Sequence, residues 1–526
     1  MSLNYKNLDE TASFKKLKTL GSPVSLKSVL NAERVKKYSV LGSTGITYNF
    51  AAKQVNDPIL SILQELSDEQ ELIAKYKEIL SGTYMNVGEN RMVLHHLTRG
   101  QLAQDVVFEG KNLRSFYADE QKKAYSFAAQ VHGGKILSST GKAFTTVVQI
   151  GIGGSDLGPR AMYLALENYA RGAGIPLKLT AQFISNVDPD DASSIMRKID
   201  LETSLFVLVS KSGTTQETLA NETFVKTALS KKGLDPKKHI VAVTSETSPL
   251  AKNPDYLTSF YIDDFIGGRY SSTSAVGGCI LALALGEEIV SQFLEGALAA
   301  DKLALETNIW KNPALMDALI GVYERNIQGY SATAVLPYSQ AMSRFPAHLQ
   351  QLDMESNGKM VNRFNKKVDY ATGPVIFGEP GTNGQHSFYQ LLHQGTDVVP
   401  LQFIGFIENQ MGQDVTIEGS TSQQKLKANL AAQIIAFAKG SANDNPNKDF
   451  PGERPASLLW APKLTPQVLG GLLAHFENKV MFQGLLWNIN SFDQEGVQLG
   501  KVLTKAVLAK GKMDDALQAF SDLLKV

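Results

Sequence analysis

The chain has 526 residues, of which 43% are hydrophobic and 20% charged, with 52 basic and 52 acidic side chains. This length exceeds what one hydrophobic core usually holds and predicts two or three domains. The balanced charge gives no reason to expect nucleic acid or an anionic membrane as a partner. The single cysteine, Cys279, excludes an internal disulfide and a cysteine-rich metal site, which favours a reducing cytoplasm.

The first hundred residues have a mainly helical pattern. Within them, the polar segment Asn86–Arg91 precedes a predicted helix over Met92–Leu97. The first twenty residues contain no apolar core of signal-peptide length. No apolar run anywhere reaches the roughly 18 residues of a membrane span. We therefore expect a cytoplasmic chain that does not cross a membrane.

A glycine-rich segment follows the first clear strand pattern. Thr145–Ile150 is predicted to be a strand, and Gly151–Pro159 then leads into a helix over about residues 160–169. The third glycine is misplaced for G-x-G-x-x-G, and no acidic residue follows about 20 residues later, so a dinucleotide site is not expected. A turn that lets the backbone approach a small anion remains open.

A second strand, turn and helix follow. The apolar run Ser204–Val209 predicts a strand buried on both faces. The hydroxyl-rich turn Ser210–Thr215 then opens a helix over Gln216–Leu229, and Thr214 with Glu217 fits a capping box. Free N–H groups and the helix dipole make such a turn suited to an anion such as phosphate. An ordinary capped turn uses the same residues, so both interpretations stay open here.

The strand and helix pattern recurs to about residue 404, and a helical region near residues 285–327 divides the strands into two sets. This order predicts two doubly wound α/β domains with parallel sheets, whose sites gather at the carboxyl ends of the strands. The remaining predicted strands are His239–Val243, Phe260–Ile262, Ala332–Leu336, Pro374–Phe377 and Val398–Ile404. From Pro466 the pattern is helical again. No P-loop, H-E-x-x-H or acidic calcium loop is present, so no protein-bound metal is expected.

Four further stretches place dense polar residues beside glycine. They are Asp264–Ser271, Gln350–Lys359, Gly378–His386 and Ser491–Lys501. Turns and caps use the same residue types, so each stretch taken alone is better explained as ordinary loop chemistry. Together with Gly151–Pro159 and Ser210–Glu217, however, they stand in one order along most of the chain.

In that order the chain resembles the glucose-6-phosphate isomerase family from about residue 86 to 501. The most specific matches are Gly267-Gly268-Arg269-Tyr270-Ser271 and Phe492-Asp493-Gln494-x-Gly-Val. The resemblance implies two sugar-isomerase α/β domains with helical extensions at both ends, a homodimer, and a reaction without cofactor or metal. The domain boundaries we expect are 1–104 for the helical N-terminal region, 105–285 and 286–510 for the two α/β domains, and 511–526 for a helical tail.

The resemblance also assigns catalytic roles. Glu355 matches the general base that carries a proton between C2 and C1 of the open sugar, and a carboxylate partly desolvated in a cleft suits that task. By chemistry alone Asp353 is its rival, and only the resemblance selects Glu355. Arg269 matches the cation beside the enediolate. His386, contributed by the neighbouring subunit, and Lys501 match the ring-opening pair.

The remaining matches are to substrate-binding positions. They are Ser210, Lys211, Ser212 and Thr215 in the phosphate loop, Gly154 and Ser155 beside it, and the glutamines Gln351 and Gln494. Some positions depart from the family's usual residues, including Ser212-Gly213 for Thr-Phe and Leu352 for Gly. We expect Gly213 to loosen the phosphate loop and Leu352 to alter packing behind the base.

The predicted function is the reversible interconversion of glucose 6-phosphate and fructose 6-phosphate through a cis-enediol. One alternative is a related isomerase that also accepts mannose 6-phosphate, which the same base and phosphate loop would serve. Another is a sugar-phosphate sensor without catalysis. A sensor needs neither a base nor a ring-opening pair, so the four catalytic matches argue against it.

Overall fold

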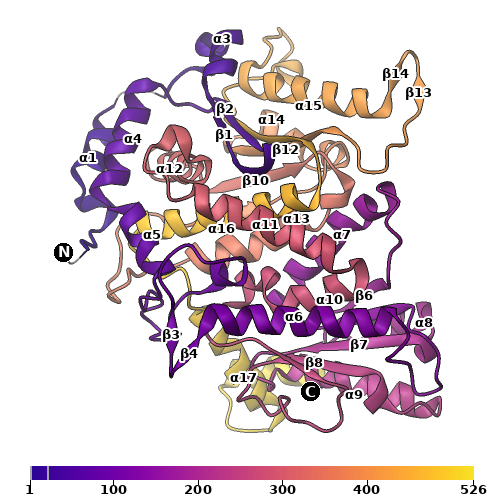
Figure 1. The fold of residues 1–526 in the computed structure, drawn as a ribbon. Coiled ribbons are helices and arrows are strands. Elements are labelled where there is room, and N and C mark those ends of the chain that lie inside the picture. Colours follow the sequence, from indigo (N-terminus) through magenta and orange to yellow (C-terminus); the bar gives the residue numbers. More distant parts are fainter. Residues whose placement is uncertain (1–2, 21–22) are drawn as a thin grey trace.

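The computed structural model describes residues 3–20 and 23–526, which form two α/β halves, each built around its own sheet (Figure 1). The first sheet is entirely parallel, with the strand order β6-β5-β7-β8-β9. Its strands are β5 (Thr146–Ile150), β6 (Thr180–Ile184), β7 (Ser204–Val209), β8 (Ile240–Thr244) and β9 (Ser259–Tyr261). The strands predicted at 145, 204, 239 and 260 are therefore confirmed.

The central strand β7 is buried on both faces, as its apolar run predicts. Leu205 and Val207 join the large hydrophobic core, whereas Phe206 and Leu208 join a second core on the opposite face. The helices α6, α7 and α10 cover the first face, and α8 and α9 cover the second. Their bounds are Leu113–His132, Leu157–Gly172, Ala275–Leu285, Pro189–Lys198 and Gln216–Lys231, in that order.

The second sheet is mixed, with the order β1-β2-β15-β12-β10-β11. The strands β10, β11, β12 and β15 run parallel, whereas β2 is antiparallel to β15 and β1 is antiparallel to β2. The bounds are β1 (Ser39–Leu41), β2 (Thr47–Ala52), β10 (Ala332–Pro337), β11 (Val375–Phe377), β12 (Leu401–Glu408) and β15 (Ala456–Lys463). The strands predicted at 332, 374 and 398 are present, the last one three residues later than expected.

The helical prediction for the first hundred residues is therefore wrong at β1 and β2. In β2, Tyr48 and Phe50 point into the core, and the Tyr48 hydroxyl donates to Asp317 at 3.0 Å. These contacts are made with residues far along the chain, so tertiary packing overrides the local pattern. Met92–Leu97 is not an α-helix either, since only a 3₁₀ turn, His95–Thr98, forms there.

Helices surround the second sheet and join the two halves. The long helix α16 is buried on nearly all sides and packs along α11, as the apolar sequence after Pro466 permits. One hydrophobic core runs from the first sheet through α10, α11 and α16 into the second sheet. The bounds of the helices here are α11 (Glu287–Leu303), α12 (Pro313–Asn326), α13 (Phe345–Gln350), α14 (Tyr389–Gln394), α15 (Ser422–Lys439) and α16 (Pro466–Leu486).

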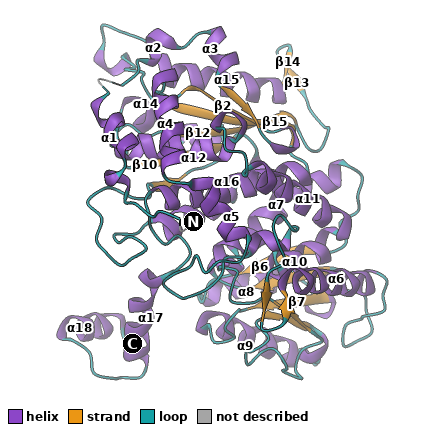
Figure 2. Cartoon of the chain, turned by 60° about the vertical axis from the view of Figure 1, so that its left-hand side comes forward, coloured by secondary structure: helices purple, strands orange, loops and turns teal. Residues whose placement is uncertain are grey.

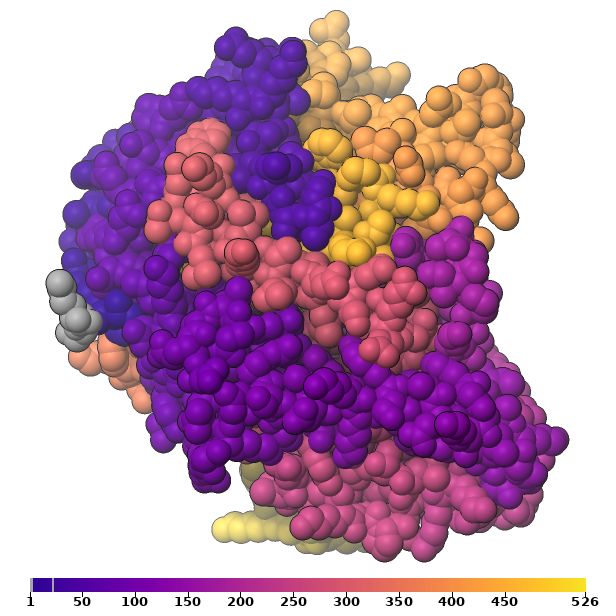
Figure 3. Space-filling model, viewed as in Figure 1, coloured from indigo at the N-terminus to yellow at the C-terminus, as the bar shows by residue number. Residues whose placement is uncertain are grey.

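The two ends of the chain behave differently. The N-terminal chain lies along one side of the molecule against both halves (Figure 3), whereas α17 and α18 project from the body near the C-terminus (Figure 2). No residue of α17 is buried. The remaining elements are α1 (Ala12–Thr19), α2 (Leu26–Val29), α3 (Ala32–Lys37), α4 (Asp57–Glu69), α5 (Leu72–Leu80), α17 (Gln498–Leu508), α18 (Asp515–Leu524) and the short hairpins β3–β4 (Val107–Phe108, Lys111–Asn112) and β13–β14 (Thr416–Ile417, Ser420–Thr421).

Candidate active site

The glycine-rich loop after β5 touches the arginine-bearing segment backbone to backbone. The loop makes a 3₁₀ turn over Gly153–Ser155, and the segment makes another over Gly268–Thr273. A Cβ atom built on Gly154 would lie 2.2 Å from the carbonyl carbon of Gly268, so only glycine permits this approach. The side chain of Gln351 lies over the same loop, since a Cβ on Gly153 would be 3.4 Å from its Nε2 atom.

Arg269 is buried, and its guanidinium is fixed by the second half of the chain. Nε donates to the Ser356 hydroxyl at 2.7 Å, and Nη2 donates to the carbonyls of Ser491 at 2.6 Å and Asp493 at 2.9 Å. Nη1 faces Oε2 of Glu355 at 3.5 Å. Within the described residues, neither of these two buried atoms has a hydrogen-bond partner. The two buried atoms therefore face each other as a long ion pair, and neither is committed to a hydrogen bond with another described residue.

Glu355 ends a π-helical turn, Gln351–Glu355, that follows α13. Such turns occur often at functional sites. Two residues earlier, Asp353 is buried, and burial raises the pKa of its carboxyl to about 6. Asp353 and Lys479 both line a cavity of about 20 Å³. The two candidate carboxylates therefore have different surroundings, and Glu355 is the one beside Arg269.

The phosphate-loop candidates form a compact turn between β7 and α9. The Ser210 hydroxyl donates to the Thr215 hydroxyl at 3.2 Å and accepts the Gly213 N–H at 3.1 Å. The Ser212 hydroxyl accepts the Thr214 N–H at 3.2 Å. Thr215 is the N-cap residue of α9 but makes no side-chain cap. The capping box predicted for Thr214 is thus wrong, because the N-cap residue is Thr215 and no side chain of a described residue caps the first turn of the helix.

The structure gives a reason for glycine at 213, and the expected loosening of the turn stays a prediction. The backbone of Gly213 has φ +66°, in the left-handed region that favours glycine. A Cβ atom there would also lie 2.1 Å from the Ser248 hydroxyl. The turn in this sequence therefore requires glycine at 213.

The Lys211 side chain leaves the turn. Its ammonium donates to the Ile266 carbonyl at 3.3 Å and lies 3.7 Å from the Asp264 carboxylate. Burial lowers the pKa of Lys211. In this conformation Lys211 ties the phosphate loop to the segment that precedes Arg269, and its role as a phosphate ligand stays a prediction.

Among the described residues, no hydrogen bond or ion pair joins the side chain of His386, Lys501 or Gln494 to Arg269 or Glu355, although Gln494 directly follows Asp493, whose carbonyl accepts from Arg269. All three side chains are exposed. His386 lies in a 3₁₀ turn before α14, and Lys501 lies on the projecting helix α17. Of the hydrogen bonds and ion pairs found among the described residues, none involves the His386 or Lys501 side chain. Their ring-opening role stays a prediction.

Comparison with known proteins identifies the family. The family model described as Phosphoglucose isomerase matches residues 49–522. The chain belongs to the phosphoglucose isomerase family. It is 64% identical to the glucose-6-phosphate isomerase of Treponema denticola over 99% of this chain and 100% of that protein. It is 59% identical to that of Treponema pallidum, over 99% and 98%.

A solved structure supports the same assignment. The glucose-6-phosphate isomerase of Chlamydia trachomatis is 43% identical and superposes with a TM-score of 0.92, covering 99% of both chains. The resemblance drawn from the sequence motifs and the α/β fold class are therefore confirmed. The boundaries of the domains and the roles of individual site residues stay predictions.

Sequence reasoning missed the groups that hold this phosphoglucose isomerase family site together. Ser356 binds Arg269 directly, and Lys359 donates to the carbonyls of Glu355 at 3.0 Å and Asp493 at 3.1 Å. Lys359 also pairs with the Asp493 carboxylate at 2.8 Å, and burial lowers the pKa of this lysine. Ser356 and Lys359 follow Glu355 closely in the sequence, and this proximity to the predicted base is the one sequence feature that could have marked them as site residues. No sequence feature marks the backbone carbonyls of Ser491 and Asp493 as acceptors for Arg269.

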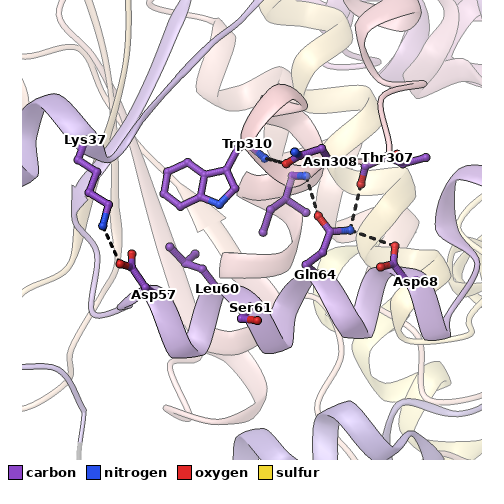
Figure 4. A pocket seen from close by; sticks show the side chains of 10 residues that line it. Lys37, Asp57, Leu60, Ser61, Gln64, Asp68, Thr307, Asn308 and Trp310 are labelled. Carbon is purple, nitrogen blue, oxygen red and sulfur yellow. Dashed lines mark hydrogen bonds and ion pairs between the residues drawn. The ribbon is translucent and has the colours of Figure 1, made fainter.

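A wide groove elsewhere is not part of this site. It encloses about 630 Å³ between α4 and residues 307–310, and none of the candidate residues lines it (Figure 4). Over residues 3–20 and 23–526, no group of three or more His, Cys, Asp or Glu side chains is placed to hold a metal ion. Across the same residues, no helix has both the length and the apolar character needed to cross a bilayer.

Proposed function

We propose that this chain catalyses the reversible interconversion of glucose 6-phosphate and fructose 6-phosphate through a cis-enediol. The observation that carries the proposal is the opposition of Arg269 Nη1 and Glu355 Oε2 at 3.5 Å, with neither atom satisfied by another described residue. The family and the names of the relatives support the choice of substrate. The reaction moves a proton within one sugar and is redox-neutral, so it needs no electron carrier.

Glu355 takes the proton from C2 of the open-chain aldose and delivers it to C1, while one proton leaves the O2 hydroxyl and one is gained by O1; together these transfers convert the aldose into the ketose. Removal of a proton beside a carbonyl places negative charge on the enediolate oxygens. Arg269 Nη1 stabilises this charge in a site where the guanidinium is already oriented by three hydrogen bonds. Asp353 is the weaker candidate for the base, because it is buried on the Lys479 side of the π-turn.

The phosphate of the substrate binds at the turn before α9. Ser210, Ser212 and Thr215 offer hydroxyl groups, and the uncapped N-terminus of α9 offers N–H groups with the positive end of the helix dipole. We assign Lys211 to the same phosphate site, where it either holds the loop in position or adds positive charge beside the phosphate. The sugar lies between this turn and Glu355, with Gly154, Ser155, Gln351 and Gln494 as its further contacts.

His386 and Lys501 open the sugar ring, with His386 supplied by the second subunit of a homodimer. The exposure of both side chains supports this assignment, because neither makes a hydrogen bond or ion pair with any described residue of its own chain. The apolar side chains left exposed on α17 also suit an assembly; they are Leu499, Val502, Leu503 and Leu508. The buried single cysteine fits a reducing compartment, and we place the enzyme in the cytoplasm.

The test is an exchange experiment with purified protein and fructose 6-phosphate in deuterated water, followed by NMR. We expect glucose 6-phosphate with deuterium at C2, because the proton on Glu355 can exchange with solvent before its return. Mannose 6-phosphate among the products would indicate the broader isomerase that also accepts this sugar. Binding without conversion or exchange would favour a sensor and refute the proposal.

A variant identifies the base. Glu355→Gln keeps the shape of the side chain and removes its basicity, so turnover should fall by about 10²- to 10⁴-fold while substrate still binds. Near-normal turnover in this variant would move the base elsewhere, with Asp353 as the next candidate.

A further inference from the structure

The segment Asn86–Arg91 is a tight turn that packs against the residues that hold Arg269. Asn86 and Arg91 pair as a β-bridge. A Cβ atom built on Gly88 would lie 2.9 Å from an Asp493 carboxylate oxygen, so the turn contacts residues 490–493 directly. We refer to residues 490–493 as the acceptor loop, because its carbonyls at Ser491 and Asp493 accept both hydrogen bonds of Arg269 Nη2.

Both polar atoms of the Asn86 side-chain amide make contacts that connect the turn to the acceptor loop. Its Oδ1 atom accepts from Asn490 Nδ2 at 2.9 Å. Its Nδ2 atom donates to the Glu89 carboxylate at 2.8 Å and lies 3.4 Å from the Phe492 carbonyl. Asn490 Nδ2 in turn donates to the Asp493 carboxylate at 2.7 Å. Asn86 is only 4% exposed, so no solvent molecule readily replaces these bonds.

We propose that Asn86 is a positioning residue for the isomerisation. Asn86 holds the acceptor loop in place, and the two carbonyls of that loop orient the Arg269 guanidinium. Asn86 therefore sets the position of Nη1 relative to the negative charge that develops beside Glu355. This inference rests on the proposed function of Arg269. Catalysis by a preorganised donor is sensitive to its position, and a displacement of about 1 Å can cost about 100-fold in rate.

The inference separates charge stabilisation from phosphate binding. None of the hydrogen bonds found in the described residues joins Asn86 to the phosphate loop at 210–215. A loss of Asn86 should therefore leave the binding of the phosphate unchanged and weaken only the recognition of negative charge near C1 and C2. A residue that merely stabilised the fold would affect both equally or neither.

The experiment uses the full chain and two probes. Sorbitol 6-phosphate carries a phosphate and is neutral at C1, whereas 6-phosphogluconate carries a carboxylate at C1 that resembles the charge of the enediolate. Calorimetry gives the affinity for each probe, and steady-state kinetics gives kcat and KM for fructose 6-phosphate. For Asn86→Ala we expect kcat to fall about tenfold or more, with KM changed less than threefold. Affinity for 6-phosphogluconate should fall by a similar factor, with sorbitol 6-phosphate unaffected.

Two further variants make the test decisive. Gly88→Ala inserts a methyl group 2.9 Å from an Asp493 carboxylate oxygen and 3.2 Å from Asn490 Nδ2, so it displaces the acceptor loop while the Asn86 side chain is retained, and it should give the same split between the two probes. Asn31→Ala is the matched control, because Asn31 caps α3 by accepting the Arg34 N–H at 2.9 Å and touches no candidate site residue. It should lower stability without changing kcat or either affinity.

The outcomes distinguish the two proposals. If Asn86→Ala and Gly88→Ala are folded and keep wild-type kcat and the wild-type ratio of affinities, Asn86 has no positioning role. An equal loss for both probes would also overturn the inference, since it would indicate general damage to the site. A wild-type protein that binds neither probe and forms no product would instead refute the proposed function itself.

Discussion

The close approach of Gly154 and Gly268 offers a sharp test of how the site is assembled. In Gly154→Ala the new methyl carbon would start 2.2 Å from the Gly268 carbonyl carbon and 2.4 Å from its oxygen. Ordinary contact begins at 3.4 Å, so the two backbones must separate by about 1.2 Å. Neither side can yield by a rotamer change, because both contacts are backbone.

The expected effect follows from what this separation moves. Gly268 directly precedes Arg269, so the guanidinium would be displaced by about 1 Å relative to the glycine-rich loop. A displacement of that size can cost about 100-fold in rate, and overpacking of this kind costs about 1–3 kcal/mol of stability. We therefore expect kcat to fall about 100-fold in a protein that remains folded at 25 °C.

The assay couples glucose 6-phosphate formation to a dehydrogenase, and urea unfolding gives stability. Gly278→Ala is the matched control: it lies within α10, and a Cβ atom there meets no other atom within 4 Å. This control should keep wild-type kcat and gain up to about 1 kcal/mol from helix propensity. Wild-type kcat in folded Gly154→Ala would refute the argument that this contact sets the position of Arg269.

Three more expectations follow from single positions. Gly213→Ala should raise KM for fructose 6-phosphate about tenfold or more with less effect on kcat, because the phosphate turn needs positive φ and has no room beside Ser248; an unchanged KM would contradict this. Burial raises the pKa of Asp353 to about 6, so the folded chain keeps a proton that the unfolded chain releases, and this one group should lower the free energy of unfolding of the wild type by about 3 kcal/mol between pH 4 and pH 7. Asp353→Asn cannot titrate, so denaturant unfolding should show its stability rising relative to wild type over that range, and a constant difference would disprove the assignment. Burial also raises the pKa of the Cys279 thiol to about 12, so a disulfide reagent at pH 8 should modify it only after unfolding, and rapid reaction of the native protein would show that the site opens.

Local sequence patterns predicted a large part of the first half. The continuous apolar run at 204–209 predicts a strand whose two faces are both covered, and in the structure β7 is buried on both faces. The strand order of the first sheet also follows the usual pattern for alternating strands and helices. The second sheet was harder, because β2 pairs with β15 across about 400 residues, and no local pattern specifies such a partner.

Motifs likewise identify the family, and they predict the residue types of the site. Chemistry left Asp353 and Glu355 as rivals for the base, and the tertiary structure gives the two carboxylates different surroundings. It buries Asp353 beside Lys479 and turns Glu355 toward Arg269. The two residues are too close in sequence for a pattern to predict which surroundings each would meet, particularly within a π-helical turn.

The sequence by itself determined the family and the strand, turn and helix around residues 204–229, and it predicted a phosphate site at that turn with an arginine and a carboxylate for enediol chemistry. Only the tertiary structure decided that Arg269 is held by Ser356 and by the carbonyls of Ser491 and Asp493, and that the turn at Asn86 supports those carbonyls. The physical reason is that every residue has a backbone carbonyl. Its position in space, which no residue type encodes, decides what it can bind.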